Sequence, residues 1–182
     1  MKKIICISGM SLSGKDAAIN HLSSNLRGSC GVIHVGGLVR LIGKTGLDLK
    51  NSKELSKLLI TKIKDSLRIN DTIIVNGIRE ECLLFSVIDE FAFNSHLFFI
   101  YINSSFISKL SRLKKRRISF IPFLFKTIED KLIGVSNLMS GTAIQGGNVF
   151  IIENNDSIIS FYDKLNELVV TIKGGGELDW LN

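Results

Sequence analysis

The sequence predicts an α/β protein in which helices flank a five-stranded, doubly wound parallel sheet. Short apolar segments rich in β-branched residues alternate with longer segments whose apolar residues recur at helical spacing. This alternation is typical of successive β-α-β units. A glycine-rich loop follows the first apolar segment. In such sheets ligands bind beyond the carboxyl ends of the strands, so functional residues are expected there.

Five segments have the composition of strands. The fourth is almost uniformly apolar, which is typical of a strand that is buried on both faces of a parallel sheet. The expected strands are residues 3–8, 32–35, 72–76, 97–102 and 149–152. The helical segments that follow them complete the doubly wound pattern.

The expected helices begin after the glycine-rich loop and continue to the end of the chain. They cover residues 17–22, 38–42, 52–67, 83–93, 106–117 and 158–172, the last capped by Asp156 or Ser157. Residues 118–125, which contain the only proline, are expected to be a connection, with a helix resuming near Thr127. Residues 47–50 are expected to be a loop, and 141–147 to interrupt a helix.

Length and composition fit one folded domain. The chain has 182 residues, of which 45% are hydrophobic and only one is proline, enough for a packed core. We expect a single domain over residues 1–172 and a flexible tail over residues 173–182, where a glycine run follows the last helix.

Charge and cysteine content restrict the partners and the compartment. The formal net charge of +6 suits polyanionic partners, nucleotides and RNA alike. Three widely spaced cysteines without a CxxC pair, Cys6, Cys30 and Cys82, indicate reduced thiols with no disulfide framework or zinc site. No apolar run approaches the ~18 residues of a membrane span. We therefore expect a cytoplasmic protein without a membrane partner.

The glycine-rich loop reads GMSLSGKD over residues 9–16, between a predicted strand and a predicted helix. That context is the one a phosphate-binding P-loop requires. Its backbone N–H groups converge on an anion, the helix adds the positive end of its dipole, and Lys15 supplies a cation for the β- and γ-phosphates of ATP. The predicted ATP-binding residues are Gly9, Met10, Ser11, Leu12, Ser13, Gly14, Lys15, Asp16 and Ala17.

Asp16 departs from the usual P-loop pattern. That position normally holds a Ser or Thr whose hydroxyl binds Mg²⁺. A carboxylate also suits Mg²⁺, which prefers oxygen ligands, whereas without a metal it repels neighbouring phosphates. Asp16 is accordingly the candidate metal ligand.

Three further segments carry a resemblance to a known family. They read GGLVR at residues 36–40, NGIR at 76–79 and RLKKRR at 112–117. Together with the P-loop they resemble the nucleoside monophosphate kinases, the adenylate kinase-like branch of P-loop proteins, over roughly residues 3–170. The sequences of these motifs most resemble those of deoxynucleotide monophosphate kinase-like proteins.

This resemblance implies an ATP- and Mg²⁺-dependent phosphotransferase that acts on a small nucleotide. Arg40 and Arg79 would hold the acceptor phosphate, since a planar guanidinium can bind phosphate with two parallel hydrogen bonds. Arg112, Arg116 and Arg117 would act catalytically from a lid segment of about residues 112–135, closing over the transferring phosphoryl group. Arg112 and Arg116 are four apart and share one helix face.

Three departures from the family pattern leave alternatives open. Gly37 and Asn76 stand where the family has acidic residues, and no arginine follows Arg117. One alternative is a dephospho-CoA kinase-like enzyme, which would share the fold and the P-loop. Another is a degenerate nucleotide- and RNA-binding factor without turnover, its basic lid contacting RNA, which we favour less. The identity of the acceptor and the oligomeric state stay open.

Overall fold

The computed structural model describes residues 1–42, 52–132, 135 and 148–174. Its centre is a five-stranded sheet in the order β2-β3-β1-β4-β5, in which every neighbouring pair is parallel. The strands are β1 (Lys2–Ser8), β2 (Cys30–His34), β3 (Thr72–Asn76), β4 (Ser95–Asn103) and β5 (Asn148–Glu153). The predicted fold class, a doubly wound parallel α/β sheet flanked by helices, is confirmed.

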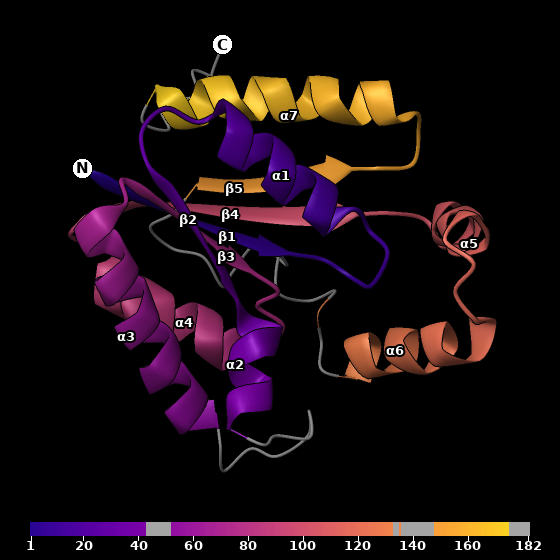
Figure 1. The fold of residues 1–182 in the computed structure, drawn as a ribbon, viewed down its shortest axis with the longest axis horizontal. Coiled ribbons are helices and arrows are strands. Elements are labelled where there is room, and N and C mark those ends of the chain that lie inside the picture. Colours follow the sequence, from indigo (N-terminus) through magenta and orange to yellow (C-terminus); the bar gives the residue numbers. More distant parts are fainter. Residues whose placement is uncertain (43–51, 133–134, 136–147, 175–182) are drawn as a thin grey trace.

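Helices cover both faces of the sheet (Figure 1). They are α1 (Lys15–Asn25), α2 (Val35–Leu41), α3 (Ser52–Ile69), α4 (Glu81–Phe91), α5 (Phe106–Lys115), α6 (Phe120–Leu132) and α7 (Ile158–Lys173). Helices α1 and α7 lie on one face and α2, α3 and α4 on the other, whereas α5 and α6 lie beyond the carboxyl ends of the strands. None of the helices in the described residues is long and apolar enough to cross a membrane.

The core is divided by the sheet into two apolar clusters. Because successive side chains of a strand point to opposite faces, Ile4 and Cys6 of β1 pack with α3 and α4, whereas Ile5 and Ile7 pack with α1 and α7. All four side chains are at most 3% exposed. Burial of both faces explains the continuous apolar runs of the central strands.

Helix α2 begins earlier than the sequence predicts and contains two glycines. It starts at Val35, directly after β2, and includes Gly36 and Gly37. Val35 and Leu38, three residues apart, are 3% and 6% exposed and pack into the core. Tertiary packing of this face therefore outweighs the cost of glycine in a helix, which is roughly 1 kcal/mol per residue.

Residues 120–125 are helical, so the expected connection over 118–125 is wrong. Pro122 is the third residue of α6. In the first turn of a helix the N–H groups have no intrahelical partner, so a proline is tolerated. The helix is fixed by a buried face that includes Phe123 and Thr127, four residues apart.

The remaining comparisons with the predicted elements concern the helix ends and the segments outside the described residues. The last helix is capped by Ser157, whose hydroxyl oxygen accepts the N–H of Ser160, as predicted, and Ser105 caps α5 in the same way. Helix α5 ends at Lys115, before Arg117 with its φ of 53°. The expected loop at 47–50, the break at 141–147 and residues 175–182 of the expected tail lie outside the described residues.

Candidate active site

The P-loop connects β1 to α1 in a conformation that requires its glycines. Gly9 and Gly14 have φ angles of 140° and 109°, a region that L-residues rarely adopt. A Cβ atom at Gly9 would lie 2.5 Å from the carbonyl oxygen of Ile102, and one at Gly14 would collide with the side-chain amide of Asn154. The sequence pattern therefore reflects both backbone conformation and close packing.

Lys15, the first residue of α1, folds back over the loop. Its Nζ atom donates hydrogen bonds to the carbonyl oxygens of Gly9 at 2.6 Å and Met10 at 2.8 Å. Burial lowers the pKa of Lys15 from 10.5 to about 8, and the negative charge of Asp130 partly opposes this shift. Its ammonium group is thus partly desolvated and forms no ion pair with a carboxylate of the described residues, which suits it to bind an anionic ligand.

Arg112 and Asn154 hold the loop by its carbonyl groups. Arg112 Nη1 lies 3.0 Å from the Leu12 carbonyl oxygen and 3.2 Å from that of Ser13, and Nη2 lies 2.6 Å from the carbonyl oxygen of Asn154. The side-chain amide of Asn154 donates to the Ser13 carbonyl at 2.8 Å. In this structure the guanidinium of Arg112 therefore binds the loop itself. The contact of Arg112 with the moving phosphoryl group stays a prediction.

Asp130 of α6 is a site residue that the sequence analysis missed. Its side chain is 1% exposed, and its Oδ2 accepts the backbone N–H of Ser11 at 2.8 Å. Its Oδ1 lies 3.1 Å from Nη1 of Arg79. The one available signal was helical spacing, because Phe123, Thr127 and Asp130 lie on one buried face of α6.

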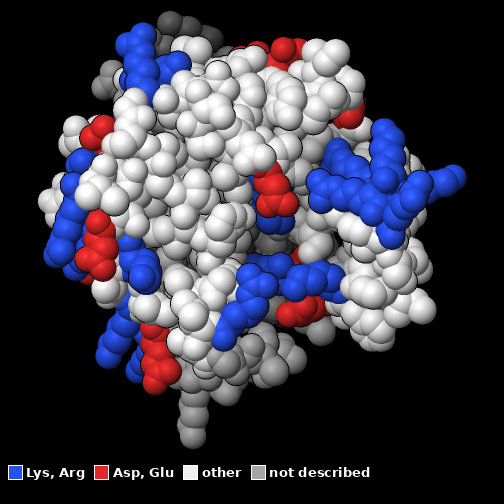
Figure 2. Space-filling view, viewed as in Figure 1, with Lys and Arg blue, Asp and Glu red and all other residues white. Residues whose placement is uncertain are grey.

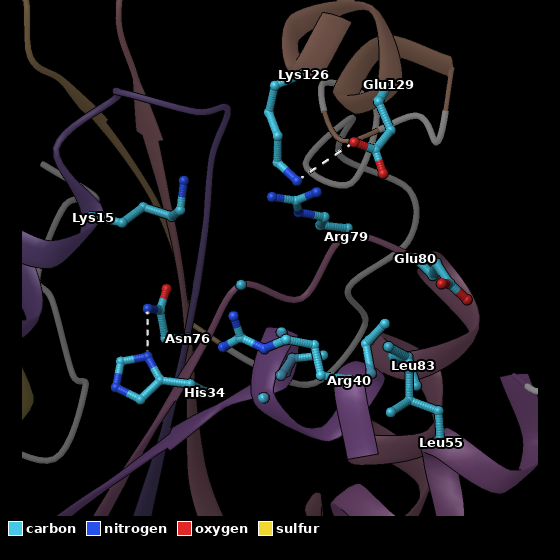
Figure 3. A pocket seen from close by; sticks show the side chains of 15 residues that line it. Lys15, His34, Arg40, Leu55, Asn76, Arg79, Glu80, Leu83, Lys126 and Glu129 are labelled. Atoms are coloured by element: carbon cyan, nitrogen blue, oxygen red, sulfur yellow. Dashed lines mark hydrogen bonds and ion pairs between the residues drawn. The ribbon is translucent and has the colours of Figure 1, made fainter. Parts of the chain in front are cut away.

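A cavity of about 500 Å³ lies beside the P-loop, between α2, the end of β3 and α6. Its wall combines three of the predicted site residues, Lys15, Arg40 and Arg79, with Lys126, which the sequence analysis had not selected. In Figure 3, Lys15 approaches from the left, Arg79 from the right, Lys126 from above and Arg40 from below. Carboxylates of Glu80 and Glu129 also line the cavity, so it offers partners to both anions and hydroxyl groups.

Three buried side-chain oxygens of the described residues have no hydrogen-bond partner, and all lie at this site: Ser13 Oγ, Asn76 Oδ1 and Asp130 Oδ1. Asn76 is held on its other side by His34, whose Nδ1 lies 3.0 Å from the amide nitrogen. Leaving a buried polar atom without a partner costs roughly 1–3 kcal/mol. Such unpaired atoms are typical of a site that a ligand, an ion or water completes.

Asp16 lines a second cavity of about 340 Å³, which shares Lys15 and Lys126 with the first and is also lined by Arg116 and Pro122. Arg117 is exposed just after α5. Figure 2 shows Lys and Arg gathered over α5 and around the central hollow. Asp16 itself is exposed, and the described residues contain no group of three or more His, Cys, Asp or Glu residues able to hold a metal ion.

Comparison with known proteins gives a fold but no sequence family. Neither the protein-family models nor the curated proteins contain a match to the sequence. Among solved structures, an unliganded sugar kinase from Janibacter sp. HTCC2649 superposes with a TM-score of 0.65 and 9% identity, over 98% of this chain and 99% of that one.

Two further solved structures are similar over nearly the whole chain. A gluconokinase from Sinorhizobium meliloti 1021 gives a TM-score of 0.61 at 10% identity and 94% coverage of both chains. A shikimate kinase from Bacteroides thetaiotaomicron gives 0.57 at 12% identity, over 94% of this chain and 98% of that one. At such identities the likeness shows the fold alone, which this chain shares with these three kinases.

Proposed function

We propose that the protein is an ATP-dependent kinase of a small molecule, which transfers the γ-phosphoryl group of ATP to the phosphate of a nucleotide. The observation that carries this proposal is the position of Lys15. Lys15 of the P-loop lines the same cavity as Arg40 and Arg79, so a phosphate of the donor and the phosphate of the acceptor would meet there. The kinase fold of the structural neighbours supports the same class of reaction.

The donor half of the site consists of the P-loop and the start of α1. Carbonyl groups of Leu12 and Ser13 are bound from behind by Arg112, which fixes the orientation of the loop peptides. Backbone N–H groups of a P-loop and the dipole of the following helix bind the phosphates of a nucleotide. Lys15 would exchange its bonds to loop carbonyls for bonds to the β- and γ-phosphates.

The acceptor half is the wall made by α2, the end of β3 and α6. Arg40 and Arg79 would hold the acceptor phosphate, and Lys126, which forms an ion pair of 3.4 Å with Glu129, lines the same cavity. Phosphoryl transfer is catalysed mainly by positioning and by neutralising charge on the phosphoryl oxygens. A phosphate acceptor needs no general base, because its attacking oxygen is already anionic. Arg116 lines the cavity next to Asp16 and would cover the donor phosphates.

The residues present are compatible with Mg²⁺ bound mainly by nucleotide phosphates and water. Asp16 offers a carboxylate at the start of α1, and Asn76 offers a buried amide oxygen that accepts no hydrogen bond. Both are oxygen donors of the kind that Mg²⁺ prefers. When bound, the metal would neutralise charge on the β- and γ-phosphates.

A second candidate is a kinase whose acceptor is a hydroxyl group, as in the alternative of a dephospho-CoA kinase-like enzyme. Glu80 and Glu129 line the acceptor cavity and can accept hydrogen bonds from hydroxyl groups. The structural neighbours, a sugar kinase, a gluconokinase and a shikimate kinase, are named for acceptors other than nucleotides, which favours this candidate.

A panel of acceptors separates the two candidates. ADP formation from ATP and Mg²⁺ would be measured with ribo- and deoxynucleoside monophosphates, dephospho-CoA, sugars and hydroxy acids. We expect turnover with one or more nucleoside monophosphates and none in a folded Lys15→Ala variant. Turnover with only a sugar, a hydroxy acid or dephospho-CoA would favour the hydroxyl acceptor. Salt-sensitive RNA binding without turnover on any acceptor would favour the degenerate binding factor.

A further inference from the structure

The carboxylate of Asp130 lies where an anionic ligand would also be stabilised. Its Oδ2 accepts a hydrogen bond of 2.8 Å from the backbone N–H of Ser11 in the P-loop, and its Oδ1 forms an ion pair of 3.1 Å with Arg79. Oδ1 accepts no hydrogen bond from the residues that the structure describes, so its pairing is incomplete. The negative charge of Asp130 also acts on Lys15, where it partly opposes the lowering of the pKa by burial. A loop N–H group and two cations thus surround a buried carboxylate.

A carboxylate oxygen and a phosphoryl oxygen make the same kinds of contact. Both accept hydrogen bonds from backbone N–H groups and form ion pairs with guanidinium groups. Two such anions cannot occupy one position, because like charges repel strongly in a partly buried site. A phosphoryl group that is bound by Ser11 and Arg79 therefore requires Asp130 to leave.

We propose that Asp130 is an internal substitute for the phosphoryl group, which holds α6 against the P-loop and is displaced when phosphate binds. The N–H of Ser11 and the guanidinium of Arg79 then form a phosphoryl oxygen subsite at the junction of the donor and acceptor halves. This inference rests on the proposed function only in that the P-loop binds phosphate. It adds that α6 is a lid released by the ligand.

The position of α6 is consistent with such a release. The helix lies away from the sheet, beyond the strand ends (Figure 1). Its buried face is narrow and includes Phe123, Thr127 and Asp130. On the outer face Ile121 and Phe125 are 64% and 70% exposed. Asp130 is the charged residue of that buried face, so neutralising it removes the ion pair and preserves the apolar contacts.

Asp130→Asn tests the proposal, because it keeps the shape of the side chain and removes the charge. Asp163→Asn on the exposed surface of α7 is the matched control for net charge. Pyrophosphate without metal is titrated into wild type and both variants by calorimetry, after thermal melts have shown that each is folded. We expect Asp130→Asn to bind pyrophosphate about tenfold more tightly than wild type does. A factor of about ten results when an internal competitor that occupies the subsite roughly nine-tenths of the time is removed. Asp163→Asn should match wild type.

Equal or weaker pyrophosphate binding by folded Asp130→Asn would overturn the proposal. Should this variant not fold, hydrogen exchange of the wild type decides: pyrophosphate should speed exchange in residues 120–132, and unchanged or slower exchange there overturns the proposal. The proposed function fails separately, if wild type binds neither pyrophosphate nor Mg-ATP. A different result would overturn only the displacement of Asp130 and leave the proposed function intact. In that case Lys15→Ala would abolish pyrophosphate binding, whereas wild type and Asp130→Asn would bind pyrophosphate with equal affinity.

Discussion

Arg112 donates a hydrogen bond of 3.0 Å to the carbonyl oxygen of Leu12, one hundred residues earlier in the chain. The contact joins α5 to the back of the P-loop. Arg116, one helical turn further on, instead lines the cavity beside Asp16. Two arginines of one basic segment thus lie in different environments, and their loss should have different effects.

Arg112→Ala should destabilise the protein, whereas Arg116→Ala should not. Arg112 makes four charge-assisted hydrogen bonds, and their loss leaves the Leu12 carbonyl without its donor, whereas the Ser13 carbonyl keeps its bond from Asn154. We expect a loss of about 2–3 kcal/mol in the free energy of unfolding, together with weaker ATP binding. Arg116 is exposed, so its removal should change stability by less than about 0.5 kcal/mol and should slow phosphoryl transfer. Urea unfolding of both variants checks this, and similar losses of stability would contradict it.

Lys15 should make the stability of the ligand-free protein dependent on pH. Its pKa is lowered by burial from 10.5 to about 8, so between these values the unfolded chain holds a proton that the folded one has lost. The free energy of unfolding of the wild type should therefore increase relative to that of Lys15→Met as the pH rises from about 8 to 10.5. Below about pH 8 the charged, buried lysine is destabilising.

Lys15→Met should accordingly melt at a higher temperature than wild type at pH 7, with the difference disappearing toward pH 10.5. The same variant should lose ATP binding, because its cation is gone. Thermal melts across pH and one ATP titration test both statements. Unchanged ATP binding by the folded variant would remove the P-loop assignment.

Arg40→Ala should weaken the acceptor far more than ATP. Arg40 is exposed at the rim of the 500 Å³ cavity, on α2, and takes no part in the P-loop. One charged contact to phosphate is worth on the order of 2 kcal/mol, or about thirtyfold in affinity. Arg68→Ala is the control, since Arg68 is paired with Asp65 on the surface of α3. Equal losses for ATP and acceptor would contradict the division into two halves.

Asp16 should make ATP binding steeply dependent on Mg²⁺. Without metal its carboxylate repels the phosphates, so Asp16→Thr should bind metal-free ATP more tightly and respond less to Mg²⁺. Asp16→Asn should relieve the repulsion but bind the metal poorly. ATP titrations of the three proteins with Mg²⁺ and with chelator provide the comparison. An identical response to Mg²⁺ in all three would show that Asp16 is no metal ligand.

The elements of the sheet were predictable because their signals are local. Residues 72–76 form β3 as expected, since a β-branched run between polar residues has few alternatives. The P-loop was predictable for a similar reason, because Gly9, Gly14 and Lys15 lie within seven residues that link a strand to a helix. Helices α2 and α6 were misplaced, since Gly36, Gly37 and Pro122 oppose helix locally and tertiary packing decides the outcome.

Contacts between distant residues could not be predicted in the same way. Asp130 meets the N–H of Ser11 across 119 residues, and Asn154 meets the Ser13 carbonyl across 141. An aspartate in a helix and an asparagine after a strand have no local feature that marks these roles. Arg112 was selected from the motif, but the motif does not show that its guanidinium faces the loop carbonyls.

The central claim is that the phosphoryl group passes from the P-loop to the cavity lined by Arg40 and Arg79. Phosphorus NMR of the folded wild type, with ATP, Mg²⁺ and the acceptor selected from the panel, tests it directly. We predict that the γ-phosphate signal decays while a new signal of the phosphorylated acceptor grows in equal amount, and that neither change occurs in Lys15→Ala. Decay of the γ signal into inorganic phosphate alone, or no decay at all, would contradict the claim.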